Sequence, residues 1–163
     1  MLRDEIEHVN ENLWSDGKVI IKPIRTEAEL AYAIFECQLT AEQQECVNPA
    51  GFSIGRAYLA REDNYPCLIY NIEKKPVGFI SLCKWLGMGD AYSWSFYVDK
   101  NYQGQGYGKS AANIAVQILK SANPDKMIKL ATEEFNVRAQ KLYISIGFKK
   151  LQELDGDDFV FGL

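Results

Sequence analysis

A glycine-rich segment, residues 98–110, carries the most recognisable chemistry in this sequence. It reads Val-Asp-Lys-Asn-Tyr-Gln-Gly-Gln-Gly-Tyr-Gly-Lys-Ser and joins an expected strand to an expected helix. Glycines in such a loop let several backbone N–H groups point at one anion, and a helix N-terminus adds roughly half a positive charge. The segment therefore predicts a cradle for a phosphate or a pyrophosphate.

Three other interpretations of this segment are open. A nucleotide P-loop requires GxxxxGK[ST]; residues 108–110 fit its end, but Gln103 stands where its first glycine belongs. A dinucleotide fingerprint requires GxGxxG, whereas residues 104–108 read GxGxG, and no acidic residue follows at a strand end. The third alternative is a glycine-rich corner that binds nothing.

Two motifs together resemble one family. Residues 103–108, Gln-x-x-Gly-x-Gly, resemble the [QR]xxGx[GA] signature of the GNAT superfamily of acyl-coenzyme A N-acyltransferases. Residues 136–148, Asn-x-x-Ala-x-x-x-Tyr-x-x-x-Gly-Phe, are similar to the NxxAxxLYxxxGF element of the same superfamily. The resemblance covers roughly residues 19–163. A closer resemblance to bacterial spermine and spermidine acetyltransferases rests on residues 47–49, Ser53, Ala57-Tyr58, Tyr65-Pro66 and residues 102–109.

The resemblance implies acetyl-coenzyme A as co-substrate. The strand end Phe96-Tyr97-Val98 would hold the pantetheine arm, and the Val98 N–H would polarise the acetyl carbonyl. Asn136 would contact the pantetheine, although a plain helix cap is its alternative role. The pyrophosphate would be held, mainly through main-chain N–H groups, by Gln103, Gly104, Gln105, Gly106, Tyr107, Gly108 and Lys109.

Tyr143 is the predicted catalytic residue and also a predicted coenzyme A contact. Attack of an amine on a thioester expels a thiolate, and a tyrosine hydroxyl can donate a proton to that sulfur. Helical spacing places Tyr143 on the same face as Asn136 and Ala139. An ordinary core tyrosine is the alternative interpretation.

The residues that bind and deprotonate the amine are harder to assign. Many relatives carry a carboxylate on the strand that here spans residues 91–96, and this sequence has none there. The predicted acceptor-binding residues are Glu36, Tyr58, Trp85, Asp90 and Tyr92, with Glu42, Glu45, Tyr65 and Trp94 as further candidates. Carboxylates and aromatic rings both suit a cationic, methylene-linked amine. Solvated surface charges and core packing are the alternatives.

The elements that must position these residues follow from apolar spacing. Residues 1–17 form a polar, partly helical leader, and residues 18–163 form the acetyltransferase domain. Strands are predicted at residues 19–24, 67–72, 77–85, 91–98, 127–132, 149–154 and 159–163. Helices are predicted from Thr26 to about Leu39, at 52–61, around 111–119 and around 139–146. The pattern predicts an α/β (α+β) fold with a mixed sheet. The resemblance implies a GNAT-like single domain, with a bent, mostly antiparallel sheet of about seven strands flanked by about four helices.

Composition excludes several classes of protein. The chain has 163 residues, of which 47% are hydrophobic, so one domain with a full core is expected. The net charge of −4 argues against a nucleic-acid partner. No apolar run approaches the roughly 20 residues that cross a bilayer, and the charged N-terminus lacks the apolar core of a secretory signal. Four cysteines without a CxxC pair predict no metal site and a reducing, cytoplasmic location.

We therefore expect an N-acetyltransferase that moves an acetyl group from acetyl-coenzyme A to a primary amine, such as spermine or spermidine, by direct attack in a ternary complex. The partner is a small-molecule amine, with no membrane and no nucleic acid, and a homodimer is a further expectation. Two alternatives stay open. One is a different acceptor, such as an aminoglycoside, an amino acid or a protein N-terminus. The other is an acyl-coenzyme A-binding module without turnover.

Overall fold

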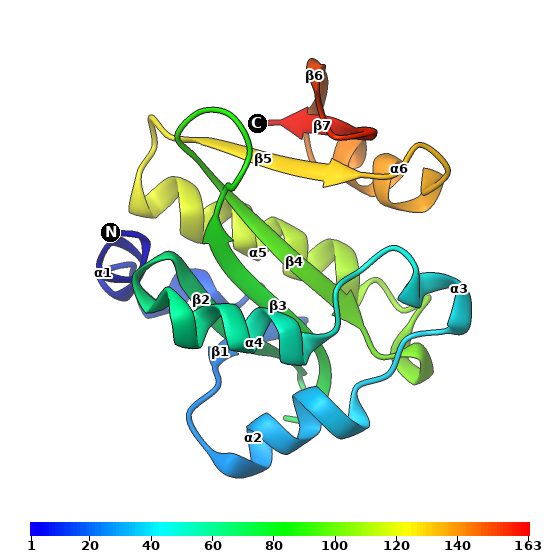
Figure 1. The fold of residues 1–163 in the computed structure, drawn as a ribbon. Coiled ribbons are helices and arrows are strands. Elements are labelled where there is room, and N and C mark those ends of the chain that lie inside the picture. Colours follow the sequence, from blue (N-terminus) through cyan, green and yellow to red (C-terminus); the bar gives the residue numbers. More distant parts are fainter.

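A seven-stranded sheet forms the centre of the structure, a computed structural model that describes residues 1–163 (Figure 1). Its strand order is β1-β2-β3-β4-β5-β7-β6, and only β4 and β5 pair in parallel. The strands are β1 (Val19–Pro23), β2 (Asn64–Asn71), β3 (Pro76–Lys84), β4 (Ala91–Val98), β5 (Met127–Thr132), β6 (Lys149–Asp155) and β7 (Asp158–Gly162). The predicted mixed, mostly antiparallel sheet is confirmed.

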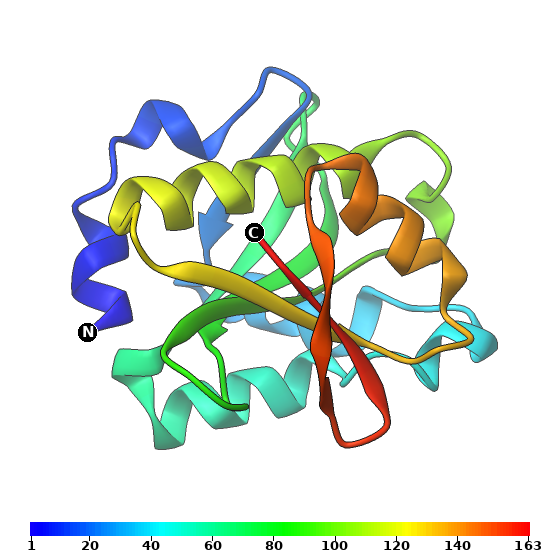
Figure 2. The same cartoon turned by 90° about the horizontal axis from the view of Figure 1, so that it is seen from above.

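Six α-helices surround the sheet, more than the four or so expected. They are α1 (Leu2–Glu7), α2 (Glu27–Ala31), α3 (Ala41–Gln44), α4 (Ala50–Leu59), α5 (Tyr107–Ala122) and α6 (Val137–Ser145). The number of helices is higher because α1 and α3 span only six and four residues. An apolar repeat cannot be recognised in the sequence over so short a length. Figure 2 shows the sheet between α5 and α4.

Side-chain alternation divides the core between the two faces of the sheet. One face and α5 build a cluster of 24 buried residues, in which Ala111, Ile114 and Ile118 of α5 are fully buried. Leu68, Phe79 and Tyr97 point to the other face and pack in a smaller cluster. Residues of β4 therefore alternate between the two cores, which fixes the direction of each of its side chains.

The segment 1–17, treated as a leader outside the domain, packs into the larger core. Leu2, Ile6 and Val9 belong to the same cluster as the buried residues of α5. The Arg3 guanidinium donates to the backbone oxygens of Arg61 (3.1 Å) and Asn64 (3.1 Å). Residues 1–17 therefore pack directly against the rest of the chain.

The helix that begins after Thr26 stops earlier than predicted. The expected capping box is present, with Thr26 and Glu29 each bonding the other's backbone N–H. The helix continues as a π-turn over residues 32–36 and ends there rather than near Leu39. The buried Asp99 carboxylate accepts the Gln38 N–H at 3.0 Å, which draws the backbone out of the helix toward the end of β4.

None of the helices is both long enough and apolar enough to span a bilayer.

Candidate functional site

The site begins where β4 and β5 separate. The two strands pair only at Ala91 with Met127 and at Tyr92 with Ile128, and they diverge beyond these pairs (Figure 1). The edge of β4 that faces β5 therefore has no strand partner over its second half. Unpaired strand backbone offers N–H and C=O groups to an extended ligand.

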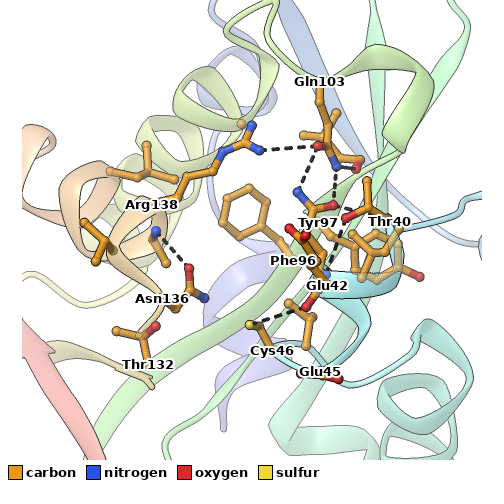
Figure 3. A pocket seen from close by; sticks show the side chains of 18 of the residues that line it. Thr40, Glu42, Glu45, Cys46, Phe96, Tyr97, Gln103, Thr132, Asn136 and Arg138 are labelled. Carbon is orange, nitrogen blue, oxygen red and sulfur yellow. Dashed lines mark hydrogen bonds between the residues drawn. The ribbon is translucent and has the colours of Figure 1, made fainter. Parts of the chain in front are cut away.

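A cavity of about 1000 Å³ lies in this gap. Its walls come from the end of β4, the glycine-rich loop, the end of β5, the start of α6 and the segment around α3. Figure 3 shows Thr132, Asn136 and Arg138 on one side and Thr40, Glu42 and Glu45 on the other. Of the predicted coenzyme A contacts, those that line the cavity are Phe96, Tyr97, Val98, Gln103, Gly104, Gly106, Tyr107, Gly108, Lys109, Asn136 and Tyr143. Gln105 is the one that does not.

The glycine-rich loop has the backbone geometry of an anion cradle. Gly104 and Gly106 have φ of +79° and +82°, a left-handed conformation that side chains with a Cβ rarely adopt. Gly106 is the N-cap of the 16-residue helix α5, whose first N–H groups have no intrahelical acceptor. Lys109 lies in the first turn of α5 and lines the cavity. The loop can therefore present main-chain donors and a cation to a phosphate group.

The side chain of Gln103 is engaged inside the protein. Its Nε2 donates to the Val98 carbonyl oxygen at 2.9 Å and to Gln43 Oε1 at 2.7 Å. Its Oε1 accepts from Gln43 Nε2 at 2.9 Å and from the Arg138 guanidinium at 3.4 Å. Only the main chain of Gln103 is left to contact an anion.

Asn136 serves as a helix cap. Its Oδ1 accepts the Ala139 N–H at 3.2 Å, so the capping interpretation accounts for the side chain's one hydrogen bond. The residue also lines the cavity at the start of α6. A contact with pantetheine would have to use its free Nδ2 group.

Tyr143 lines the cavity and is largely buried. The residue is 9% exposed, and its ring packs against Phe148 and Phe161, with ring centres 6.0 and 5.9 Å away. Burial, with a smaller contribution from the negative charge of Glu133, raises the pKa of Tyr143 to about 12. The hydroxyl therefore stays protonated at neutral pH, as a proton donor must.

The five predicted acceptor-binding residues do not line this cavity. Tyr92 is buried on the side of α1, where its hydroxyl donates to the Glu5 carboxylate. Asp90 forms an ion pair with Lys126 at 3.3 Å. Trp85 packs in a small cluster with Ala91 and Val160. Glu36 and Tyr58 are exposed, Glu36 at the end of the π-turn and Tyr58 on α4.

Among the further candidates, two carboxylates do line the cavity. Glu42 and Glu45 lie on and just after α3, and neither forms an ion pair. On the opposite wall, Thr132 is 3% exposed, and its Oγ1 has no hydrogen-bond partner. Tyr65 and Trp94 are core residues, where Tyr65 packs against Trp14 and Trp94 against Phe148.

Comparison with known proteins identifies the family. The family model described as "Acetyltransferase (GNAT) family" matches residues 28–148, about three quarters of the chain. This chain belongs to the GNAT family. Its two signature motifs, residues 103–108 and residues 136–148, lie in this matched region.

Individual relatives match this GNAT protein either over a short stretch or at low sequence identity. The spermine/spermidine N(1)-acetyltransferase of Bacillus subtilis (strain 168) is 38% identical over 60 residues, which is 37% of this chain and 40% of that protein. The match thus spans about two fifths of that relative's length. A spermidine N-acetyltransferase from Vibrio cholerae, solved with CoA and spermine, shares 13% identity over 90% of this chain and 94% of its own, with a TM-score of 0.61.

An aminoglycoside acetyltransferase solved with coenzyme A has a TM-score of 0.65 and 20% identity over 88% of this chain and 92% of its own. At such identities, the two solved structures show a shared fold.

Three polar residues near the GNAT site were not foreseen. Arg138 and Gln43 line the cavity, and Glu133 lies close enough to raise the pKa values of Tyr143 and Cys46. Arg138 lies within the second motif, at a position where the motif accepts any residue. Only its positive charge could have identified it as a candidate. Glu133 follows directly after β5, where a strand end meets the site. No group of three or more His, Cys, Asp or Glu side chains is placed to hold a metal ion.

Proposed function

We propose that this GNAT protein transfers the acetyl group of acetyl-coenzyme A to a primary amine, with a polyamine such as spermine or spermidine as the acceptor. The observation that carries the proposal is the shared cavity. It brings together the glycine-rich loop, the unpaired end of β4, Tyr143 and two unpaired carboxylates.

The residues present fit coenzyme A. The pyrophosphate would meet the main-chain N–H groups at the start of α5, with Lys109 and Arg138 as nearby cations. The pantetheine arm would extend along the β4 edge that β5 leaves unpaired. When bound, acetyl-coenzyme A supplies an acetyl thioester. The Val98 N–H would donate to its carbonyl oxygen as negative charge develops there.

Three residues would handle charge and protons in the transfer, Glu42 and Glu45 on the amine side and Tyr143 at the sulfur. An aliphatic amine has a pKa near ~10.4 and arrives protonated, so it would first lose one proton to water. The free nitrogen would then attack the acetyl carbon, and the C–S bond would break as the C–N bond forms. The nitrogen would lose its second proton to water, which would replace the proton that Tyr143 gives to the sulfur. Glu42 and Glu45, without basic partners of their own, would attract the protonated amine to the α3 wall of the cavity. Tyr143, protonated at neutral pH, would donate to the departing sulfur. The name of the Bacillus subtilis relative supports a polyamine as the cation.

Thiol release from acetyl-coenzyme A tests this function directly. Spermine, spermidine, putrescine, lysine and an aminoglycoside are offered separately, and release is followed with a thiol reagent. We expect release with spermine or spermidine and little with the others. Release only with the aminoglycoside or lysine would keep the acetyltransferase and reject the polyamine. Coenzyme A binding by calorimetry without release from any amine would reject turnover of these acceptors.

The role of the two carboxylates predicts a change in acceptor KM. Glu42→Gln and Glu45→Gln should each raise the KM for spermine about five- to tenfold, because each removes one attraction in a partly exposed site. The KM for acetyl-coenzyme A should stay within about twofold. Steady-state kinetics at low and high salt measure both constants.

Glu27→Gln, an exposed substitution on neighbouring α2, is the matched control and should leave both constants unchanged. Unchanged spermine KM values in both α3 variants would remove these carboxylates from acceptor binding. The salt series adds a second check, since added salt should weaken spermine binding less in the variants than in the wild type.

A further inference from the structure

Two glutamine side chains meet head to head at the cavity. Gln43 of α3 and Gln103 of the glycine-rich loop lie 60 positions apart in the sequence, and both line the cavity. Each amide donates to the other's oxygen, at 2.9 Å from Gln43 Nε2 and 2.7 Å from Gln103 Nε2. This reciprocal pair links the predicted pyrophosphate loop to the helix that carries Glu42.

The Gln103 amide also holds the opposite side of the site. Its Nε2 donates to the Val98 carbonyl oxygen at the end of β4, and its Oε1 accepts from Arg138 of α6 at 3.4 Å (Figure 3). One side chain thus contacts three elements that build the cavity. A ligand that orders the loop around Gln103 will therefore also restrict the position of Gln43.

Helix α3 depends on such polar contacts for its position. It spans four residues, none of them buried, so it has little apolar packing to hold it. Its own capping box joins Thr40 and Gln43, with distances of 3.3 and 3.4 Å. At its N-terminal side, the Gln38 backbone bonds Asp99 and Lys100. None of these other hydrogen bonds joins a side chain at the cavity-facing end of α3 to the glycine-rich loop. The Gln43–Gln103 pair makes that connection.

We propose that Gln43 is a positioning residue, which couples occupancy of the coenzyme A loop to the placement of Glu42 and Glu45. This inference rests on the proposed function. With the loop ordered, the amide pair holds α3 so that both carboxylates face the cavity. With the pair absent, α3 moves more freely and the acceptor meets a poorly placed pair of charges. Because coupling between two sites is reciprocal, the amine in turn strengthens coenzyme A binding.

Steady-state kinetics of Gln43→Ala test the coupling. Because the coupling is reciprocal, the KM for spermine at saturating acetyl-coenzyme A and the KM for acetyl-coenzyme A at saturating spermine should each rise by a similar factor of about five or more, while kcat stays within twofold. Gln44→Ala is the matched control, because Gln44 lies next to Gln43 but bonds only the Leu39 carbonyl oxygen. It should behave as wild type. A rise in only one of the two KM values, or no rise in either, would overturn the proposal.

Two further variants separate the amide pair from the stability of α3 itself. Thr40→Ala removes the half of the capping box that the Thr40 hydroxyl makes with the Gln43 N–H, and it keeps the Gln43–Gln103 pair. Its effect on spermine KM should therefore be smaller than that of Gln43→Ala. An equal effect would assign the positioning to the cap and reject the pair. In the double variant Gln43→Ala with Gln103→Ala, the two effects on spermine KM should be clearly less than multiplicative.

Hydrogen exchange with coenzyme A as the only probe needs no acceptor. Saturating coenzyme A should slow exchange of residues 38–46 in the wild type and leave it unchanged in Gln43→Ala. The same slowing in both proteins, or none in the wild type, would overturn the coupling. This readout is independent of turnover. Slowing that requires Gln43, in a protein that acetylates no amine, would reject the proposed function and retain the coupling.

Discussion

Tyr143→Phe should lower kcat about a hundredfold while the affinity for coenzyme A stays within about twofold. The substitution removes only the hydroxyl, so the ring contacts with Phe148 and Phe161 that keep this part of the core packed are preserved. A thiolate that leaves without a proton donor is a poorer leaving group. The loss therefore belongs to the chemical step and not to binding. Stopped-flow thiol release and calorimetry with coenzyme A measure the two quantities separately.

The pH dependence gives the same prediction a sign. Burial raises the pKa of Tyr143 to about 12, so the donor form persists well above neutral pH. Ionisation of Tyr143 should therefore cause no fall in kcat between about pH 7 and pH 10. Tyr58→Phe is the control, because the Tyr58 side chain is exposed on α4, and this variant should leave kcat unchanged. A Tyr143→Phe protein with wild-type kcat would end the proton-donor role of Tyr143.

Gly106→Val should weaken coenzyme A binding about tenfold or more while the protein still folds. The φ of +82° at this N-cap costs a β-branched residue about 1–2 kcal/mol, so the loop should relax away from its cradle geometry. A Cβ at Gly106 would also lie 2.7 Å from Lys18 Nζ, but a flexible lysine end can move aside. Backbone strain at the start of α5 is therefore the main cause of the expected loss.

Gly156→Val separates strain in general from strain at the site. Gly156 also has a positive φ, +61°, at the turn between β6 and β7, and a Cβ there would meet nothing within 4 Å. This control should lose stability yet keep its affinity for coenzyme A. Calorimetry and circular dichroism on both variants give the comparison. A folded Gly106→Val protein with wild-type affinity would remove the loop from phosphate binding.

Local signals in the sequence predicted the sheet and many of the residues that line the cavity around the glycine-rich loop. The reason is physical: a left-handed glycine, an asparagine cap and an apolar helix face each depend on residues a few positions away. Gly106, Asn136 and the buried face of α5 are of this kind. Such features can be derived from spacing alone because no distant segment is needed to create them.

The acceptor side could not be predicted in the same way, because it depends on packing between distant segments. Tyr92 was a candidate, but its hydroxyl donates to Glu5 of α1, a helix that packs against α5 and β2, and no pattern in residues 1–17 indicates that contact. Glu36 was among the predicted acceptor-binding residues, and Glu42 was only a further candidate. The bond from Gln38 to Asp99, 61 positions away, turns the chain so that Glu42 lines the cavity and Glu36 does not.

Helix α1 also shows that the region matched by the family model and the region that packs around one core have different boundaries. The region shared with the GNAT family starts at residue 28, after α1 and β1. Yet Leu2, Ile6 and Val19 are buried in the same cluster as α5, the helix whose first turn builds the predicted phosphate site. The part of the chain that the family model matches is therefore smaller than the part that packs around one core. Residues outside the matched region thus support the geometry of the site from behind.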